Sequence, residues 1–550
     1  QVQAALGVTA DSLTPAELMK AILLAPVDLL WNGGIGTYVK AAHETHAEVG
    51  DKANDAIRVN GKELRCRVVG EGGNLGLTQE GRIEYALAGG RVNTDAIDNS
   101  AGVDCSDHEV NIKILLGQAV ASGSLTQEER NALLATMTDE VAELVLRDNY
   151  EQNVALGNAR AQAPEMLPVH RRHLAHLERV GLVDRVVESL PDEAELEART
   201  AAGGGLTSPE FAVLLAWTKI GLTEEILASD VPEDAYLGQE LERYFPQPLR
   251  ERYRTEMANH RLRREIIATV VVNKVVNHAG ITFAHRMAEE VAAPAPDIVR
   301  AHTVASQVFA MPAFWSAVEA LDNVVATDVQ TAALLRGRQL VERATRWLLS
   351  TRRHPIDIAA TVQAFAPGAA LVTARIPTLL GERRAAELRD LAARYVAEGV
   401  PEELATQVAG FPAAYSALDV VEVAGATDHP VEEAAALYFA LDSLLELGTL
   451  RERVVALPRN DRWQTLARAA LRDDLNAAQA ALTAHVITTT DSGDPDKRIA
   501  TWVDLHSAAV GRAAQVLADI VAGDVYDVAT LSVALRQIRG LTQTSTAGEA

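Results

Sequence analysis

The sequence predicts an α/β fold at the amino terminus, a partial Rossmann-like parallel sheet, followed by a large all-α carboxyl-terminal region. Within residues 1–110, three short apolar segments alternate with helical patterns, and each segment ends in a break rich in glycine or small residues. From Thr126 onward, apolar residues recur at helical spacing and strand-like alternation is almost absent. These observations place an α/β segment at residues 1–120 and a helical region at residues 121–540.

The apolar segments are the expected strands, and they cover residues 27–31, 64–69 and 92–98. Helices are expected around them, at residues 14–24, 37–56 and 78–88. Thr14 and Thr78 are suitable amino-terminal caps, and Pro15 fits the first helical position. Strands that alternate with helices are parallel, because their connections must cross over. Three strands are too few for a complete doubly wound domain, so we expect the second half of one.

A further helix is expected to begin at Ser106. Ser106 and Glu109 have the spacing of a capping box, and apolar residues follow at helical intervals. A serine at a helix start lies where free backbone N–H groups and the positive end of the dipole hold an anion. The residues alone favour a purely structural interpretation, in which Ser106 caps the helix and Glu109 completes the capping box. Asn99, at the predicted strand end, would face the same edge, unless it forms an ordinary Asx turn.

The region at residues 121–540 is expected to be all helical and to form two lobes. Capping boxes at Thr126 and Thr207 open its first long helices, of which the first should extend to about Tyr150. Further helical patterns cover about residues 249–279, 297–351, 384–396, 431–446, 460–486 and 498–521. Breaks are expected at residues 191–205, 292–297, 366–368 and 488–496. The polar end, residues 541–550, is expected to be a flexible tail.

Composition excludes several function classes. The chain has 51 Lys and Arg against 75 Asp and Glu, a net charge of −24, which argues against a nucleic-acid surface. Two cysteines, Cys66 and Cys105, make no disulfide framework, and no signal-peptide pattern is visible, so we expect the cytoplasm. No apolar run is long enough to predict a membrane span. Because the chain begins with Gln1 rather than Met, we expect a piece of a longer polypeptide.

The breaks that follow the three predicted strands, at residues 32–36, 70–76 and 99–106, are together the candidate ligand-binding edge. Ligands of open parallel sheets bind where the strands end, and glycine lets backbone approach a ligand closely. Residues 70–76 approach a dinucleotide-binding glycine pattern, but Leu75 stands where its third glycine is needed. A tight turn in which Asn74 adopts positive φ is the structural alternative, and spacing alone favours it. The histidines complete no zinc pattern, so no metal site is expected.

The first 120 residues resemble the carboxyl-terminal part of the nucleotide-binding domain of glutamate dehydrogenases, specifically the large NAD-specific bacterial class. Glu71-Gly-Gly-Asn74 is similar to the family's Glu-Gly-Ala-Asn element. Asn99-Ser-Ala-Gly-Val-Asp-Cys-Ser106 resembles its Asn-Ala-Gly-Gly-Val-x-x-Ser element. Residues 27–40, Leu206-Thr-Ser-Pro-Glu-Phe-Ala-Val-Leu214 and Tyr244-Phe-Pro246 also look like the large class, so the resemblance covers essentially the whole chain.

The resemblance implies NAD as cofactor and the oxidative deamination of L-glutamate to 2-oxoglutarate and ammonia. It implies that Asn74 and Asn99 contact the dinucleotide near its nicotinamide ribose, and that Ser106 hydrogen-bonds the distal carboxylate of glutamate. The full set of implied cofactor-binding residues is Asn32, Gly33, Gly34, Glu71, Gly72, Gly73, Asn74 and Asn99. A homo-oligomer of the full-length chain is also implied.

The family's catalytic lysine, catalytic aspartate and dinucleotide glycine loop have no match in this sequence. We expect them upstream of Gln1, which would make this segment inactive alone. One alternative is a non-catalytic helical scaffold or regulatory module with a degenerate α/β remnant. A weaker alternative is another amino-acid dehydrogenase, which should lack a hydroxyl at Ser106 if its substrate has no second carboxylate.

Overall fold

The computed structural model describes residues 2–458, 461–523 and 526–542, and the chain divides into two compact units. The first unit is Gln1–Arg286 and the second is Met287–Ala550. This division lies well after residue 120, because elements of the α/β segment pack against later helices of the first unit. Most of the predicted tail, residues 543–550, lies outside the described residues.

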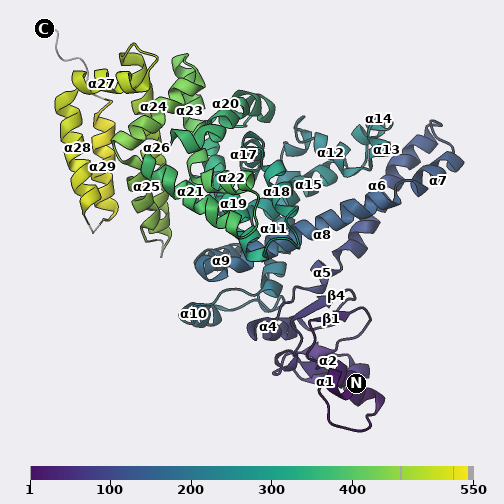
Figure 1. Cartoon of the computed structure of the whole chain (residues 1–550). Helices are drawn as coiled ribbons and strands as arrows, with labels where there is room; N and C mark the ends of the chain where they lie inside the picture. The colour runs from purple at the N-terminus through teal and green to yellow at the C-terminus, as the bar shows by residue number, and fades with distance from the viewer. Residues whose placement is uncertain (1, 459–460, 524–525, 543–550) are drawn as a thin grey trace. The chain divides into compact units, whose positions relative to one another are not determined.

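The strands of the first unit are short and parallel. β1 (Leu29–Asn32) pairs with β4 (Val68–Glu71), and Asn32 lies opposite Glu71 at the carboxyl ends. β2 (Val39–Lys40) pairs with β3 (Val59–Asn60) in a second two-stranded sheet. The two segments predicted at residues 27–31 and 64–69 are therefore neighbouring parallel strands, but the described residues form no larger Rossmann-like sheet (Figure 1).

The prediction of a third strand at residues 92–98 is wrong, because this segment contains a short helix. A single parallel bridge joins Arg91 to Val68, after which the chain enters the short helix α5 (Asp95–Asp98). Thr94 stands at its amino-terminal cap and Asp95 in its first turn. These residue types favour a helix start over a strand interior, and they override the short apolar pattern.

The helix predicted at residues 37–56 is also wrong. This stretch contains β2, the single-turn helix α3 (His46–Val49) and a 3-10 turn, η1 (Lys52–Asn54). Thr45 and Glu48 form a capping box that begins α3, and Gly50 ends it with a φ of 76°. Polar composition suggested a longer helix, but a glycine in the left-handed conformation ends this one after a single turn.

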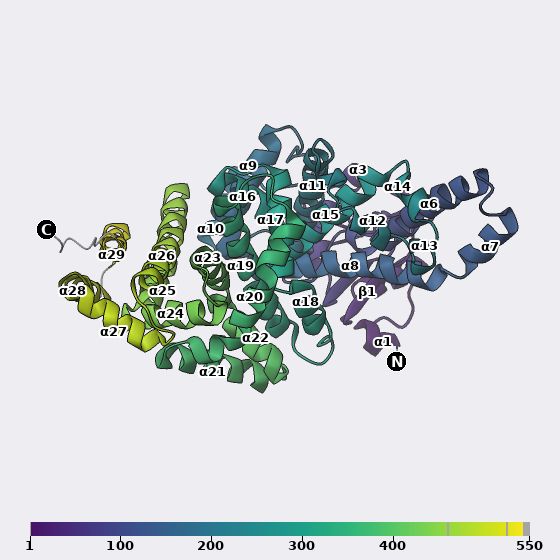
Figure 2. The ribbon, with the colours of Figure 1, turned by 90° about the horizontal axis from the view of Figure 1, so that it is seen from above.

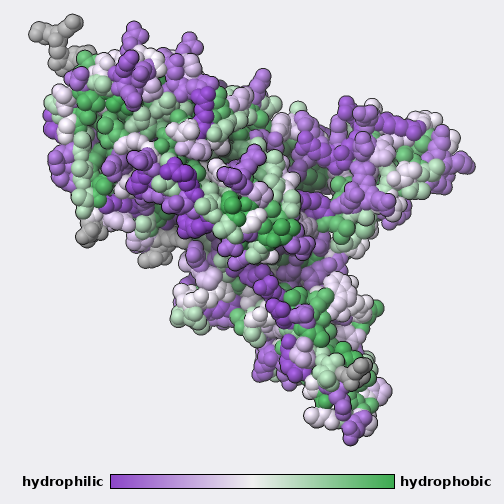
Figure 3. Space-filling model, viewed as in Figure 1, coloured by the Kyte–Doolittle hydropathy of each residue, from purple (hydrophilic) through white to green (hydrophobic). Residues whose placement is uncertain are grey.

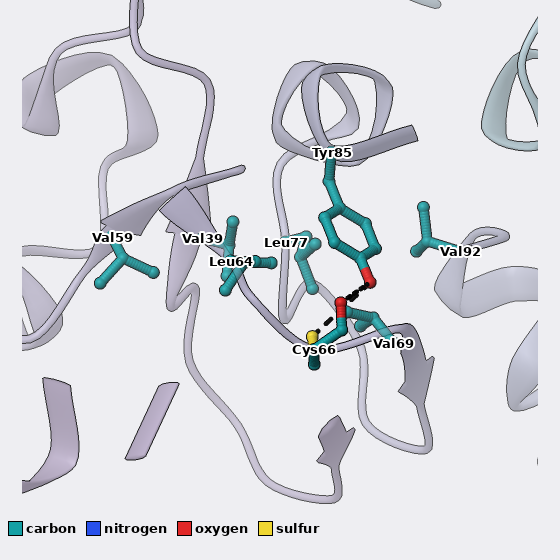
Figure 4. Packing of buried hydrophobic residues seen from close by; sticks show 8 residues of the cluster. All are labelled: Val39, Val59, Leu64, Cys66, Val69, Leu77, Tyr85 and Val92. Atoms are coloured by element: carbon teal, nitrogen blue, oxygen red, sulfur yellow. Dashed lines mark hydrogen bonds between the residues drawn. The ribbon is translucent and has the colours of Figure 1, made fainter. Parts of the chain in front are cut away.

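A small apolar core positions the edge where β1 and β4 end. Its buried members are Val39, Val59, Leu64, Cys66, Val69, Leu77, Tyr85 and Val92 (Figure 4). Tyr85 lies on α4 (Gln79–Leu87), and its hydroxyl donates a 2.9 Å hydrogen bond to the backbone oxygen of Cys66. This contact fixes α4 beside β4, so the turn that joins them has little freedom.

The remaining helices of the first unit begin largely where the sequence predicts. Thr14, Thr78, Thr126 and Thr207 each cap a helix as expected. The helix expected from Thr126 to Tyr150 is interrupted at Met137, and the break expected at residues 191–205 contains a helix. The helices and 3-10 turns not yet given are α1 (Val2–Leu6), α2 (Pro15–Leu23), η2 (Gly61–Glu63), α6 (Ser100–Ala121), α7 (Gln127–Ala135), α8 (Thr138–Ala161), α9 (Ala163–Arg179), α10 (Glu193–Ala201), α11 (Ser208–Leu227), η3 (Val231–Glu233), α12 (Gln239–Tyr244), α13 (Gln247–Arg250), α14 (Arg254–Ala258), α15 (Arg263–Ala279) and α16 (Phe283–Val291), which crosses into the second unit.

The described residues of the second unit are helical throughout, as predicted. The break expected at residues 366–368 lies inside α20, where Pro367 is tolerated and a Cβ atom on Gly368 would lie 2.5 Å from the Val421 side chain. Gly368 therefore allows close packing inside a helix, and neither residue forms a loop. The helices are α17 (Ala295–Val308), α18 (Met311–Glu319), α19 (Thr327–Thr351), α20 (Ile358–Leu379), α21 (Glu382–Ala397), α22 (Glu402–Ala414), α23 (Ala417–Thr427), α24 (Val431–Leu444), α25 (Leu447–Ala456), α26 (Arg462–Thr489), α27 (Pro495–Leu505), α28 (Ser507–Ala522) and α29 (Val528–Gly540).

The visible surface intersperses hydrophilic and hydrophobic residues (Figure 3). Among the described helices, none alone has the length and apolar composition of a membrane span. Two consecutive pairs, α15 with α16 and α20 with α21, pass the same criterion together but are bent by 84° and 102°.

Candidate functional site

The loops that follow β1 and β4 lie against each other at the carboxyl end of the sheet. The N–H of Gly73 donates a 3.0 Å hydrogen bond to the backbone oxygen of Asn32. A Cβ atom on Gly73 would lie 2.7 Å from the Gly34 carbonyl oxygen, and one on Gly72 would lie 2.5 Å from the Trp31 ring. Glycine is therefore required here by the close approach of the two loops, before any ligand is considered.

Glu71 is a buried anchor beneath this edge. Its carboxylate accepts hydrogen bonds of 2.6 and 3.0 Å from the Arg82 guanidinium on α4, and one of 3.1 Å from the Leu77 N–H. Burial raises the pKa of Glu71, and the Arg82 charge opposes that rise. Because both carboxylate oxygens are engaged inside the protein, Glu71 holds the turn between β4 and α4.

Two aspartates of α5 hold the same turn from the other side. Asp98 accepts a 2.9 Å hydrogen bond from the Glu71 N–H, and Asp95 accepts one of 2.8 Å from the Leu75 N–H. Leu75 takes the left-handed backbone conformation, with a φ of 57°, so positive φ falls here and not at Asn74 as the turn interpretation expected. The turn is thus fixed at three backbone points by buried or partly buried carboxylates.

Asn74 and Asn99 are brought together by these contacts. The Asn99 side-chain amide donates a hydrogen bond to the Asn74 side-chain oxygen. Asn74 lies in the loop after β4, and Asn99 stands at the cap position where α6 begins. The two asparagines, 25 residues apart in sequence, therefore share one edge of the first unit.

Helix α8 holds the start of α6 in place. The side chains of Asn149 and Gln152 each donate a 2.8 Å hydrogen bond to the Ser100 hydroxyl oxygen. Asn149 also donates a 2.8 Å hydrogen bond to the Ile97 carbonyl oxygen. The first long helix of the all-α region thus fixes the backbone on either side of Asn99, a contribution that the sequence did not indicate.

Ser106 does not begin a helix, which corrects the sequence prediction. It is the seventh residue of α6, it is exposed, and its hydroxyl donates a 2.6 Å hydrogen bond to the Val103 carbonyl oxygen. The capping-box spacing with Glu109 occurs inside a helix that Asn99 already begins. Ser106 therefore has neither free backbone N–H groups nor the positive helix end beside it.

Ser106 nonetheless shares a helix face with Asn99. Seven residues complete almost two helical turns, and a rise of about 1.5 Å per residue separates the two positions by about 10 Å along the axis. Val103 lies between them, one turn after Asn99, and is exposed. The predicted cofactor and substrate contacts therefore lie along one side of α6, at separate points.

Exposed apolar residues lie on the same chain segments as the candidate cofactor contacts. Trp31 is 60% exposed, Ile35 is 96% exposed and Leu75 is 64% exposed. Trp31 and Asn32 are the last two residues of β1, Ile35 lies in the following loop with Gly33 and Gly34, and Leu75 lies in the loop after β4 with Gly72, Gly73 and Asn74. Flat apolar surface next to amide donors and acceptors suits a planar ring with polar substituents, such as nicotinamide. The buried side-chain nitrogen of Asn32 has no hydrogen-bond partner, whereas its side-chain oxygen accepts one from the Gly34 N–H.

A second polar cluster lies between α6 and α8 and was not predicted from the sequence. The cluster consists of Asp104 and His108 of α6 and Asp148 of α8, and these side chains line a cavity of about 400 Å³. Burial, with Asp148 and Asp107 adding to it, raises the pKa of Asp104 to about 7. Burial also raises the pKa of Asp148 to about 6 and lowers that of His108 to about 4. The imidazole is therefore uncharged at neutral pH.

Two motifs on which the family resemblance rested have structural roles here. The Tyr244 ring stacks on His108 with centroids 4.3 Å apart, and the Tyr244 hydroxyl accepts a 2.9 Å hydrogen bond from Asn111. Glu210 closes the capping box of Thr207 and forms a buried pair with Arg199 at 2.7 and 2.8 Å. Both motifs stabilise the helices that flank the candidate site.

The chain matches two glutamate dehydrogenase families. Residues 203–540 match the family described as "Glutamate dehydrogenase, C-terminal", and residues 1–159 match "Bacterial NAD-glutamate dehydrogenase, catalytic domain". Among similar curated proteins, each named NAD-specific glutamate dehydrogenase, the one from Mycobacterium tuberculosis is 45% identical over 555 residues. Those from Pseudomonas aeruginosa and Halomonas elongata are each 44% identical.

These alignments cover 99% to 100% of this chain but 34% of each relative. The chain thus spans about a third of the length of the curated relatives that it matches. The match at residues 1–159 covers the α/β segment together with α6 and α7 and almost all of α8, and the match at residues 203–540 covers most of the helical remainder. The chain belongs to the family of bacterial NAD-specific glutamate dehydrogenases.

Proposed function

We propose that this chain provides one wall of the active site of an NAD-dependent glutamate dehydrogenase. The reaction converts L-glutamate, NAD⁺ and water to 2-oxoglutarate, ammonium, NADH and a proton. The observation that carries the proposal is the contact between Asn74 and Asn99, which joins the two sequence elements that resemble the family's cofactor contacts. The relatives' names, which specify NAD and glutamate, support it.

In this proposal the two asparagine amides bind the dinucleotide near the nicotinamide ribose. NAD accepts the hydride when bound, while the protein supplies orientation and electrostatics. Asn32, Gly33 and Gly34 line the cofactor cleft, and Gly72 and Gly73 keep the neighbouring loop close enough to share it. Glu71, whose carboxylate is engaged with Arg82, acts by holding this loop in place and not through direct cofactor contact.

Ser106 binds the distal carboxylate of glutamate in this proposal. Its exposed hydroxyl can leave the Val103 carbonyl oxygen and donate to a carboxylate. Ser106 lies about 10 Å along α6 from Asn99. This separation suits glutamate bound with its reacting carbon near the cofactor and its distal carboxylate at Ser106. The reaction also needs an acid–base group, and because the family's catalytic lysine and aspartate have no match in this sequence, we assign proton transfer to the remainder of a full-length polypeptide.

The test is NADH production by a polypeptide of the relatives' full length that contains this chain, compared with Asn99→Ala and Ser106→Ala variants. We expect Asn99→Ala to raise the KM for NAD and Ser106→Ala to raise the KM for glutamate. If both variants retain wild-type kinetics, a helical scaffold or regulatory role replaces this proposal. If an amino acid without a second carboxylate is the better substrate, another amino-acid dehydrogenase activity replaces it.

We further infer that the full-length protein acts in the cytoplasm as a homo-oligomer, and that its larger Rossmann-like sheet extends the β1–β4 pair. The acidic balance and the two free cysteines, Cys66 and Cys105, support the cytoplasmic assignment. The oligomer and the extended sheet rest on the family resemblance. Cell fractionation and sedimentation of the full-length protein test the first two inferences.

A further inference from the structure

The cluster between α6 and α8 has the geometry of a cation site. Asp104 and His108 are four residues apart on α6, so they lie on one helix face, and Asp148 reaches them from α8. One donor atom from each residue lies within 4.8 Å of the other two, and the Asp104 carboxylate is 4.0 Å from His108 Nε2. Helices α6 and α8 contact each other within the first unit (Figure 2).

Three buried polar atoms of this cluster lack a hydrogen-bond partner, although the Asp104 and Asp148 carboxyl groups share a hydrogen bond with each other. The His108 side chain is 2% exposed, yet neither ring nitrogen has a hydrogen-bond partner. The Asp104 Oδ2 atom is likewise buried without one. Buried polar atoms are nearly always satisfied, so a set of them that faces one cavity indicates a missing ligand. The cavity of about 400 Å³ leaves room for water to complete a coordination shell.

Asp104 and Asp148 differ from the other acidic residues that line the cavity. Of the neighbouring acids that line the cavity, Glu151 pairs with Arg147 at 2.8 Å and Glu240 pairs with Lys274. Arg147 also acts electrostatically on Asp148 and favours its charged form. Lys219 acts on Asp148 from farther away, and Asp107 adds negative charge. Two close, partly buried carboxylates beside a buried imidazole without hydrogen-bond partners are a costly arrangement unless a cation joins them.

We propose that Asp104, His108 and Asp148 bind a divalent first-row transition cation, for which zinc and manganese are the best chemical matches. Two carboxylates and an imidazole suit these ions, and Asp-His spacing of one helical turn presents both ligands to one point. Metal–ligand distances of about 2.0–2.2 Å require donors within about 4.4 Å of each other, which small side-chain rotations achieve here. Three protein ligands leave open positions for water.

The bound ion would tie α6 to α8 through Asp104 and His108, which lie two residues before and two residues after the proposed glutamate contact, Ser106. It would therefore fix the helix face that carries Asn99 and Ser106 without contacting the cofactor. The metal proposal stands on the cluster itself and does not depend on the proposed dehydrogenase activity. A metal content measurement therefore tests it separately.

The direct test measures bound metal in the full-length polypeptide that contains this chain, after expression with zinc or manganese and exhaustive dialysis. We expect a single ion per chain, and at least ~10-fold weaker binding in Asp104→Asn, His108→Gln and Asp148→Asn. Asp107→Asn is the matched control, because it removes a nearby carboxylate outside the proposed ligand set. It should retain the ion.

A second measurement covers variants that fold poorly. The wild-type protein is stripped with a chelator and titrated with Zn²⁺, Mn²⁺ or Mg²⁺ while its melting temperature is followed. Zn²⁺ or Mn²⁺ should raise the melting temperature at micromolar concentration and Mg²⁺ should not, because an imidazole ligand disfavours it. Absence of bound metal together with an unchanged melting temperature overturns the proposal and assigns the cluster to a proton shared between the two carboxyl groups. Equal metal content in the wild type and all three ligand variants also overturns it.

Discussion

The Asn99 side chain donates a hydrogen bond to the Asn74 side chain across 25 residues of sequence. This contact joins the loop after β4 to the start of α6, and exposed apolar side chains lie in the adjoining loops. A hydrogen bond between two solvent-facing amides contributes little to stability alone. Its position at a strand's carboxyl end is better explained by the ligand that both amides would share.

The asparagine pair should therefore behave as a coupled unit toward NAD. Asn74→Ala and Asn99→Ala should each raise the KM for NAD. The double variant should lose less NAD-binding free energy than the sum of the losses in the two single variants. The expected coupling energy is about 0.5–1.5 kcal/mol, that of one neutral hydrogen bond. Steady-state kinetics of the full-length polypeptide at saturating glutamate measure it. Asn131→Ala, which removes an exposed amide of α7, is the control, and full additivity would mean that the two amides act separately.

Ser106→Ala should affect glutamate and not NAD. Loss of one charge-assisted hydrogen bond of about 1.5–3 kcal/mol predicts a KM for glutamate raised about ten- to a hundred-fold. The melting temperature should not change, since Ser106 is exposed and its hydroxyl bonds only to its own helix. Ser122→Ala, at the other end of α6, provides the matched control. An unaltered KM for glutamate removes Ser106 from the substrate site.

Arg82→Met should destabilise the turn after β4. The substitution leaves the fully buried Glu71 carboxylate without its partner, which typically costs about 3–5 kcal/mol. Hydrogen exchange should then accelerate over residues 68–77 by the corresponding factor. Arg383→Met provides a contrast, because its exposed pair with Glu387 should be worth less than about 1 kcal/mol. Equal protection of residues 68–77 in wild type and Arg82→Met would show that the buried pair does not hold the turn.

The second unit should lose stability as the pH rises, because of Asp419. Burial raises the pKa of Asp419 to about 7, even though Trp347 and Tyr438 donate hydrogen bonds to its carboxylate at 2.8 and 3.3 Å. The unfolded chain ionises this group near pH 4, so ionisation penalises the folded state increasingly between about pH 4 and pH 7.

Asp419→Asn should abolish this part of the pH dependence while it keeps an oxygen for the Trp347 N–H. Urea unfolding followed by tryptophan fluorescence at a series of pH values measures the effect. Asp390→Asn, at an exposed position of α21, is the control. An unchanged pH slope in Asp419→Asn would contradict the assignment.

Local signals in the sequence predicted local structure well. The caps at Thr14, Thr78, Thr126 and Thr207 were correct because a cap depends on residues within one turn. The same signal misled at Ser106, because nothing between Ser100 and Ser106 stops a helix and α8 fixes its earlier start. A capping-box spacing inside a longer helix carries no information about where the helix begins.

Contacts that need distant residues could not be predicted. The glycine run at residues 70–76 suggested a ligand, yet Gly72 and Gly73 are required by Trp31 and Gly34, whose proximity only the fold reveals. The Asp104–His108 spacing was visible in the sequence, but its third member, Asp148, comes from another helix. The order of the two asparagine motifs, by contrast, anticipated their meeting at one edge.

A structure of the full-length polypeptide with NAD and 2-oxoglutarate tests the central claim most directly. The account predicts the nicotinamide ribose within hydrogen-bonding distance of the Asn74 or Asn99 amide, and the distal carboxylate of 2-oxoglutarate against the Ser106 hydroxyl. A dinucleotide bound at another surface, with both asparagines still bonded only to each other, would contradict it.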